Sequence, residues 1–408
     1  MDSTYTISPV AGAGVSLGGG GFTPDTFVMT AEGATRVDAI SPGTEVYALD
    51  PMTRLVKPKR LTAVQQIAFD GPLVTVETRR ANFHVAPGHP MLYRTKNDQQ
   101  PRFQRAGDLP DRHSYKFITN WQRPPREPLE AVDITELIDD YEISATFDEH
   151  GHTVRAMLPA GCEPTRCNSH TGYFFDPATF KQFQSLIETA AATVRIHSAP
   201  GHRHRPYRFE GDDFIRLIGW FVTEGSVYHK QNRNSAEIQI AQKTERHRDS
   251  IRTLFDRLEI SVTEKPEGFV FGSLLYGRLL ERLCGEDSHS KRLPHFVWTL
   301  PRRQQKLLLD VLVAGDGDEY GTYYTASERL ASDVLRLCVD VGLNPRYRLR
   351  RGTWAIHPAK VNDGFQSPRH VASMPSNDSV CQLTVADYSA VLAGRKRKFQ
   401  WVGVSNVS

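Results

Sequence analysis

The sequence of 408 residues lacks the marks of a membrane or secreted protein. No run of about eighteen or more uncharged apolar residues is present, so we predict no membrane-spanning helix. The glycine-rich N-terminal segment has no basic stretch followed by an apolar one, so we expect no secretory signal. Cysteine is scarce: five residues, an odd number, argue against a disulfide framework and favour a reducing, cytoplasmic compartment.

A strong overall charge is also absent, because the net charge is only +3. The total charge therefore gives no evidence for a nucleic-acid partner, and the distribution of charge is more informative. Basic residues cluster with aromatic side chains in a pattern typical of phosphate-binding surfaces, and equally compatible with solvated strands and turns. The clusters are HRHRPYR (202–208), RYRLRR (346–351) and RKRK (395–398), whereas acidic residues concentrate in DITELIDDYE (133–142).

Two similar stretches form an internal repeat. LIGWFVTEGSV begins at Leu217 and LLDVLVAGDGDEY at Leu308, and each is an apolar segment with helical spacing that ends in an acid followed by glycine. The two acids, Glu224 and Asp316, are 316 − 224 = 92 residues apart. A second amphipathic segment follows each copy at an offset of 328 − 245 = 83 residues, so the loop after the first acid is nine residues longer. The pattern predicts two copies of helix, acid–glycine, β-hairpin and helix.

The repeat predicts a site between its two copies. The apolar helices bury their faces best against each other about a pseudo-twofold axis, which brings Glu224 and Asp316 together at the helix C-termini. Adjacent carboxylates repel each other unless a cation lies between them, and oxygen ligands suit Mg²⁺. The alternative is that each acid simply ends its helix, and the match between the two copies argues against it.

The segments LIGWFVTEG and LDVLVAGDG resemble the two LAGLIDADG motifs of homing endonucleases, over about residues 210 to 350. The resemblance implies an α/β domain of two αββαβ repeats, in which Glu224 and Asp316 are catalytic and bind Mg²⁺, or Mn²⁺ in its place. Gln242 and Lys243 match a glutamine and a lysine that lie beside the cleavage site in related enzymes. The second copy has no lysine at this place, so equal cleavage of both DNA strands is not implied.

The resemblance also implies a monomer with internal pseudo-twofold symmetry, because both motifs lie in one chain. Its partner would be double-stranded DNA, with the hairpins in the major groove, where side chains contact bases and phosphates. The candidate DNA-binding residues are Tyr228, Lys230, Arg233, Tyr323, Arg346, Arg348, Arg350 and Arg351.

The flanking segments carry a second resemblance. GFTPDTFVMTAEGATRVDAISPGTEVYALDP, FHVAPGHPML, VCQLTV and FQWVGVSN resemble the successive blocks of inteins and related Hint domains. The positions implied in protein splicing are Gly21, His89, Ser405 and Asn406. Glycine offers no nucleophile for the first acyl shift, and Ser405 replaces the usual penultimate histidine. We therefore predict a Hint scaffold whose splicing is lost or disabled.

The segment before the repeat is harder to interpret. It is either a linker or an inserted DNA-recognition subdomain. Its cysteines and histidines could bind zinc, although their spacing fits no common zinc finger. These residues are His150, His152, Cys162, Cys167 and His170.

Together, these features predict a multi-domain fold in which an all-β Hint-like (horseshoe) domain is split by the α/β endonuclease domain. The expected segments are a flexible, extein-like lead at 1–20, the Hint parts at 21–125 and 371–406, the linker or subdomain at 126–208, the endonuclease at 209–370 and extein-like residues at 407–408. The predicted function is site-specific, metal-dependent double-strand cleavage of DNA. Two alternatives stay open: a DNA-binding regulator or maturase without cleavage, and a splicing-competent intein.

Overall fold

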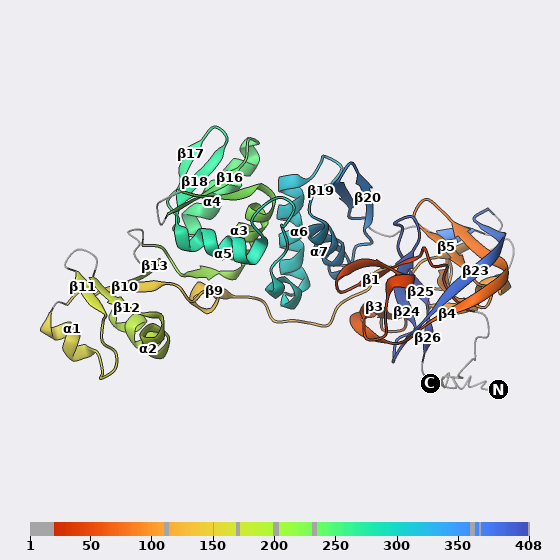
Figure 1. Cartoon of the computed structure of the whole chain (residues 1–408), viewed down its shortest axis with the longest axis horizontal. Coiled ribbons are helices and arrows are strands. Elements are labelled where there is room, and N and C mark those ends of the chain that lie inside the picture. The colour runs from red at the N-terminus through yellow and green to blue at the C-terminus, as the bar shows by residue number, and fades with distance from the viewer. Residues whose placement is uncertain are drawn as a thin grey trace, which may run out of the picture. The chain divides into compact units, whose positions relative to one another are not determined.

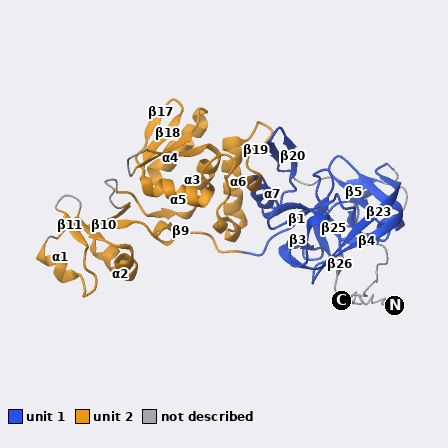
Figure 2. Cartoon of the chain, viewed as in Figure 1, with its two compact units in different colours: residues 1–125, 331–408 blue, residues 126–330 orange. Residues whose placement is uncertain are grey.

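The computed structural model describes residues 20–109, 114–149, 151–168, 172–198, 204–230, 235–359, 364–366 and 369–406 (Figure 1). The chain divides into two compact units, one of residues 1–125 and 331–408 and the other of residues 126–330 (Figure 2). The first unit is therefore discontinuous in sequence. Its border after residue 125 is one of those expected, whereas its border after residue 330 differs from the one expected after residue 370, and the six-part division of the chain stays a prediction.

Both ends of the chain contribute to the large sheet of the first unit. The long strands β4 (Leu55–Glu77) and β23 (Val371–Val385) pair antiparallel from Val371↔Val76 to Val385↔Leu61, with a register shift at the last pair. The sheet has the order β2-β1-β24-β3-β4-β23-β26, with β25 on β24 and β5 on β4. Its other strands are β1 (Phe27–Thr30), β2 (Gly33–Arg36), β3 (Glu45–Asp50), β5 (Asn82–Val85), β24 (Ala390–Gly394), β25 (Gln400–Gly403) and β26 (Ser405–Asn406).

A smaller sheet and a helix also belong to this unit. The sheet has the order β22-β8-β6-β7 and consists of β6 (Pro90–Thr95), β7 (Arg102–Arg105), β8 (Ser114–Lys116) and β22 (Gly364–Gln366). Helix α7 (Glu328–Asp340) begins in the second unit and ends in the first. Its last residue, Asp340, has a fully buried side chain that lies 2.9 Å from a guanidinium nitrogen of Arg123 and accepts a hydrogen bond from the Tyr47 hydroxyl. A buried ion pair therefore holds the end of α7 against the β-rich part.

The second unit begins with a small α/β subdomain. Its four-stranded sheet has the order β11-β12-β10-β13, with β10 (Glu142–Thr146), β11 (Arg166–Asn168), β12 (Gly172–Phe175) and β13 (Thr193–His197). The helices are α1 (His152–Met157) and α2 (Pro177–Ala190), and Asp176 caps α2 by accepting a hydrogen bond from the Thr179 N–H. A two-stranded ribbon of β9 (Ala131–Asp133) and β14 (Arg208–Glu210) connects this subdomain to the repeats.

The two copies of the repeat differ more than predicted. The first has the order α3 (Gly211–Glu224), β15 (Gly225–His229), β16 (Ala236–Ala241), α4 (Glu245–Arg257), β17 (Thr263–Lys265), β18 (Gly268–Gly272), α5 (Leu274–Cys284). The second has the order α6 (Arg302–Asp316), β19 (Tyr323–Thr325), α7, β20 (Arg346–Arg350), β21 (Thr353–His357). The first hairpin shrinks in the second copy to a tight turn closed by a bridge between Gly317 and Tyr323, which accounts for the nine missing residues.

The sheet of the first repeat has one face on helices and one in solvent. Its order is β15-β16-β18-β17. On β16, Ile238 and Ile240 are fully buried, whereas the alternate residues Glu237 and Gln239 are partly exposed. This alternation is that of an antiparallel sheet with one covered face.

No helix among the described residues is long and apolar enough to cross a membrane.

Candidate metal-binding site

Helices α3 and α6 each end at an acid because the following glycine packs tightly on the last helical turn. A Cβ atom on Gly225 would lie 2.5 Å from the Phe221 carbonyl oxygen, and one on Gly317 would lie 2.2 Å from the Val313 carbonyl oxygen. No other residue fits at these positions without a change of the backbone. The acid–glycine ending thus has a steric cause that is the same in both copies.

The two helices touch through residues at equivalent positions of the repeat. A Cβ on Gly219 would lie 2.6 Å from Val311 Cγ1, and a Cβ on Gly315 would lie 2.3 Å from Thr223 Oγ1. Both pairs have the offset of the two acids, since 311 − 219 = 315 − 223 = 92. Each glycine therefore makes room for the larger residue at the same position of the other helix, and the helices approach closely next to their acidic ends.

Gln242 holds the first of the two acids. Its amide nitrogen donates to Glu224 Oε1 at 3.2 Å, while its amide oxygen accepts from the backbone N–H groups of Lys243 and Thr244 at 3.0 and 2.9 Å. Gln242 is buried, so these bonds fix the orientation of its side chain. Burial raises the pKa of the Glu224 carboxyl above its ordinary value.

The second acid is strongly perturbed. Burial, and next the negative charge of Glu224, raise the pKa of Asp316 to about 7, and the positive charge of Lys291 opposes this rise. The charge of Glu224 therefore acts on Asp316, whereas burial alone raises the pKa of Glu224. A cation bound there would favour both ionised forms.

Lys291 is the functional candidate that sequence reasoning missed. Its ammonium donates to the carbonyl oxygens of Phe221 and Gly225, at 2.9 and 3.0 Å, and so caps the C-terminus of α3. The side chain is only 5% exposed, and burial lowers its pKa to about 8, against the raising effects of neighbouring acids that include Asp316. The signal available in the sequence was its place, in SKRLP just before the second motif helix.

Lys243, the lysine predicted for the site, lies differently. Its residue is exposed, and only its backbone N–H takes part in the Gln242 network. The structure thus brings together Glu224, Gln242, Asp316 and Lys291.

The donor set fits a hard divalent ion with an incomplete protein shell. Two carboxylates supply oxygen ligands, and Mg²⁺ in proteins usually takes one or two carboxylates and completes its shell with water and phosphate oxygens. No group of three or more His, Cys, Asp or Glu residues suited to a metal occurs within the described parts of the chain. That includes the zinc candidates Cys162, Cys167 and His152, whereas His150 and His170 lie outside the described residues.

The predicted DNA-binding residues have mixed surroundings. Tyr228, on β15, is 65% exposed, and Lys230 is exposed with Glu237 at 3.6 Å. The prediction that Tyr323 contacts DNA at the surface is wrong, because its side chain is fully buried. Burial, and next the charge of Asp316, raise the pKa of its hydroxyl. Arg233 lies outside the described residues.

The four predicted arginines of the second repeat belong to the other compact unit. Arg348, Arg350 and Arg351 are exposed on the hairpin of β20 and β21, and Arg346 is partly buried. Gln239 is not among the predicted DNA-binding residues, yet its partly exposed side chain shares a face of the first sheet with Tyr228.

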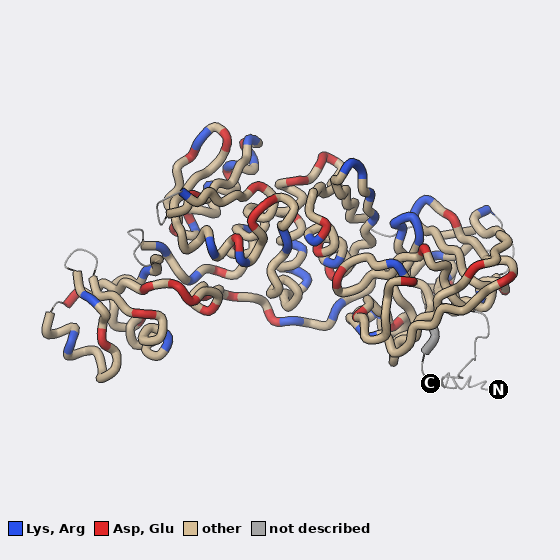
Figure 3. Tube along the Cα trace, in the orientation of Figure 1, with Lys and Arg blue, Asp and Glu red and all other residues tan. Residues whose placement is uncertain are grey.

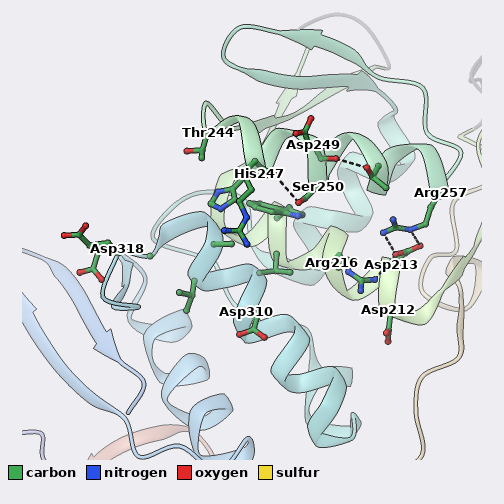
Figure 4. A pocket seen from close by; sticks show the side chains of 18 of the residues that line it. Asp212, Asp213, Arg216, Thr244, His247, Asp249, Ser250, Arg257, Asp310 and Asp318 are labelled. Carbon is green, nitrogen blue, oxygen red and sulfur yellow. Dashed lines mark hydrogen bonds and ion pairs between the residues drawn. The ribbon is translucent and has the colours of Figure 1, made fainter. Parts of the chain in front are cut away.

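A groove of about 1490 Å³ runs beside α3, α4 and α6 (Figure 4). Trp220 and His247 lie in it with ring centroids 5.7 Å apart, and Asp213 pairs there with Arg216 and Arg257. Acids outnumber bases in its lining, and neither Glu224 nor Asp316 belongs to it. Phosphate groups would be repelled by such a lining, so the groove is not the site of the predicted DNA contact.

The predicted splicing positions lie along β23. The Gly20 carbonyl accepts a hydrogen bond from Gln382 Nε2 at 2.6 Å, and β26 runs parallel to β23 with Thr384↔Ser405 and Val385↔Asn406. A Cβ on Gly21 would lie 2.8 Å from Val380 Cβ, and its backbone has φ of +154°, so this position is shaped for glycine.

His89 is buried beside this junction. Its ring stacks edge-on against Phe22 with centroids 4.3 Å apart. Burial lowers the pKa of His89 to about 3, so the imidazole is neutral at physiological pH. A neutral, apolar-packed histidine is a poor proton donor, whatever its role in the scaffold.

Comparison with known proteins adds a family match. Residues 213–273 match the family model described as a LAGLIDADG-like domain. The DNA polymerase of Thermococcus sp. (strain GE8) is 24% identical over 170 residues, which are 40% of this chain and 10% of the polymerase. The iron-sulfur cluster assembly SufBD family protein ML0593 of Mycobacterium leprae is 29% identical over 141 residues, 33% of this chain and 16% of that protein. The chain thus spans a small part of the length of these relatives.

Among solved structures, inteins are similar to parts of the chain. The TvoVMA intein is 16% identical, with a TM-score of 0.21 and coverage of 25% of this chain and 72% of the intein. The AceL NrdHF class 3 split intein is 14% identical, with a TM-score of 0.20 and coverage of 52% of this chain and 92% of that one.

Proposed function

We propose that this chain, which carries a LAGLIDADG-like domain and is similar to inteins, is a site-specific, metal-dependent endonuclease that cleaves double-stranded DNA. In this proposal the LAGLIDADG-like part contains two pseudo-symmetric repeats, and a Hint-like scaffold without active splicing surrounds it. The chain acts as a monomer, since both motif helices belong to it.

The observation that carries the proposal is the contact between equivalent positions of α3 and α6. Gly219 faces Val311 and Thr223 faces Gly315, at one common offset of 92 residues, as expected of two helices related by a pseudo-twofold axis. The acids that follow share this offset, and the pKa of Asp316 responds to the charge of Glu224. The alternative in which each acid merely ends its own helix does not account for this coupling.

The chain's own residues have definable roles in this reaction. Glu224 and Asp316 would hold Mg²⁺, with Mn²⁺ as a substitute, and Gln242 orients Glu224 through its amide hydrogen bond. Bound Mg²⁺ would acidify a coordinated water and neutralise charge on phosphate oxygens. Lys291, with its pKa of about 8, keeps most of its positive charge at neutral pH and would stabilise negative charge that develops on the phosphate.

The test begins with selection of a cleaved site from a random DNA library in Mg²⁺. On that site, Glu224→Gln should lose cleavage by on the order of a hundredfold or more, because an amide is a poor ligand for a hard cation. The matched control is Glu136→Gln, an exposed glutamate that takes part in none of the contacts described for the site. Undiminished cleavage by Glu224→Gln would overturn the proposed role.

Two other functions give different outcomes. A DNA-binding regulator or maturase would yield no cleaved site from the library in Mg²⁺ or Mn²⁺, and the unaltered and Glu224→Gln chains would bind duplex DNA with equal affinity. An active intein would release flanking segments on incubation, visible as a change of intact mass. Gly21 supports the absence of splicing, since it has no nucleophile and no space for one beside Val380.

A further inference from the structure

The basic cluster at 395–398 contacts the hairpin of β20 and β21. The backbones of Arg346 and Lys398 form an antiparallel bridge, and the Asn344 side-chain amide donates to the Phe399 carbonyl at 2.6 Å. The ring of Tyr347 stacks on Phe399 with centroids 6.1 Å apart. These contacts join two segments of the first unit that are far apart in sequence.

The same cluster is attached to the turn that follows β4. The Lys398 ammonium donates to the Thr78 carbonyl at 2.6 Å, and the Arg395 N–H donates to the Asn82 carbonyl at 2.8 Å. Arg79, in the middle of this turn, is exposed. Three separate segments therefore bring basic residues to one region of the first unit, in which Figure 3 shows several blue stretches.

The two central residues of the cluster have a strained backbone. Lys396 and Arg397 adopt positive φ angles of 49° and 63°, which residues other than glycine rarely do. The Arg397 guanidinium lies over the Tyr347 ring at 5.2 Å, and the Lys396 side chain is 62% exposed, with Glu77 at 3.5 Å. Neighbouring contacts must stabilise this turn, which is typical of a functional segment.

Four arginines of this region have no acidic partner among the described residues. Within the described part of the chain, no ion pair involves Arg79, Arg348, Arg350 or Arg351. By contrast, exposed arginines elsewhere in the same unit are paired: Arg36 with Asp38, Arg60 with Glu45 and Arg102 with Asp98. Several guanidinium groups without a neighbouring acid favour binding of a polyanion whose charge is uniform along its length.

We propose that Arg79, Arg348, Arg350, Arg351, Lys396 and Arg397 form one phosphate-binding surface, the basic ridge, which binds the backbone of duplex DNA. The Hint-like scaffold thereby contributes its own DNA contacts through Arg79, Lys396 and Arg397. This inference rests on the proposed function and extends the DNA partner to a part of the chain outside the LAGLIDADG-like match. The basic ridge does not distinguish one DNA sequence from another, because phosphate contacts carry no sequence information.

The test is the salt dependence of binding to a fluorescent duplex of random sequence, with the full chain in a chelator so that no cleavage occurs. The ridge variant combines Arg79→Gln, Arg350→Gln and Arg397→Gln, one from each segment and none of them paired with an acid within the described residues. We expect the slope of log Kd against log salt to fall by about 3, at close to one per lost phosphate contact. Circular dichroism of each variant checks that the fold is kept.

The matched control combines Arg36→Gln, Arg60→Gln and Arg102→Gln, which changes the net charge equally at acid-paired positions. It should change the slope by less than about one, as paired surface arginines release few counterions. Equal slopes for the ridge and control variants would overturn the ridge, as would an effect on duplex RNA with none on duplex DNA. If the unaltered chain binds no duplex at any salt concentration, the proposed function itself fails, which is a distinguishable outcome.

Discussion

Replacement of Asp316 by asparagine should stabilise the metal-free protein at alkaline pH. The folded chain holds the pKa of Asp316 at about 7, against 3.8 for an unperturbed aspartate. A rise of about 3 pK units corresponds to about 4 kcal/mol of unfavourable free energy for the ionised form, at about 1.4 kcal/mol per unit. This figure is an upper limit, because Asp316→Asn also removes an anion that favours the charged form of Lys291.

The sign of the effect depends on pH. Between about pH 4 and 7 the folded state binds more protons than the unfolded state, so the free energy of unfolding falls as pH rises. The full cost of ionised Asp316 is present above pH 7 and absent below about pH 4. Urea unfolding in a chelator at about pH 8.5 and 4.5 should therefore give a large gain for Asp316→Asn at the higher pH and little at the lower.

A neighbouring acid provides a control of opposite sign. The Thr322 N–H and then other hydrogen bonds hold the pKa of Asp318 below its ordinary value, so Asp318→Asn should destabilise the protein at alkaline pH. Added Mg²⁺ should raise the stability of the unaltered chain and leave Asp316→Asn nearly unchanged, since only a bound ligand shifts the equilibrium. Stability of Asp316→Asn equal to or below that of the unaltered chain at both pH values would refute the reasoning.

Three further outcomes are expected. Gly315→Ala should lower the free energy of unfolding by about 1–3 kcal/mol, because the added Cβ meets Thr223. The second substitution Thr223→Gly should restore part of this loss. A higher melting temperature for Gly315→Ala alone would contradict the close contact between the helices. Asp340→Asn should cost about 3 kcal/mol or more in urea unfolding, as it leaves the Arg123 charge buried without its partner, and a loss below about 1 kcal/mol would disagree. Lys291→Met should reduce cleavage of the selected DNA by on the order of a hundredfold, whereas Lys243→Met should change it little; the reverse order would restore the lysine favoured by the sequence.

Parts of the candidate site could be predicted from the sequence because a local residue pattern there has the same physical cause as the packing. The acid–glycine ending could be recognised because each glycine is dictated by the turn before it, so the same letters recur in both copies. Gln242 could be placed beside Glu224 by resemblance, and the hydrogen bond between them is present. The family match over residues 213–273 confirms the LAGLIDADG part of the resemblance.

The remaining features depend on tertiary contacts that leave no local pattern. Lys291 is ordinary in sequence, and its importance comes from the carbonyl groups of α3, seventy residues away at Phe221. Tyr323 could be assigned to the surface only by assuming a second hairpin like the first, and the shorter turn directs it into the interior. Likewise, the ridge partners Arg79 and Lys396 are separated by most of the chain.

The contact between α3 and α6 has a consequence for the independence of the two halves. Gly219 faces a valine and Thr223 faces a glycine, so small meets large at both positions. If the first half instead associated with another copy of itself, two glycines would leave a void and two threonines would collide. Like-with-like dimers are thereby disfavoured, and neither half can replace the other. If the chain cleaves DNA as proposed, this unlike pairing suits a target whose two arms differ.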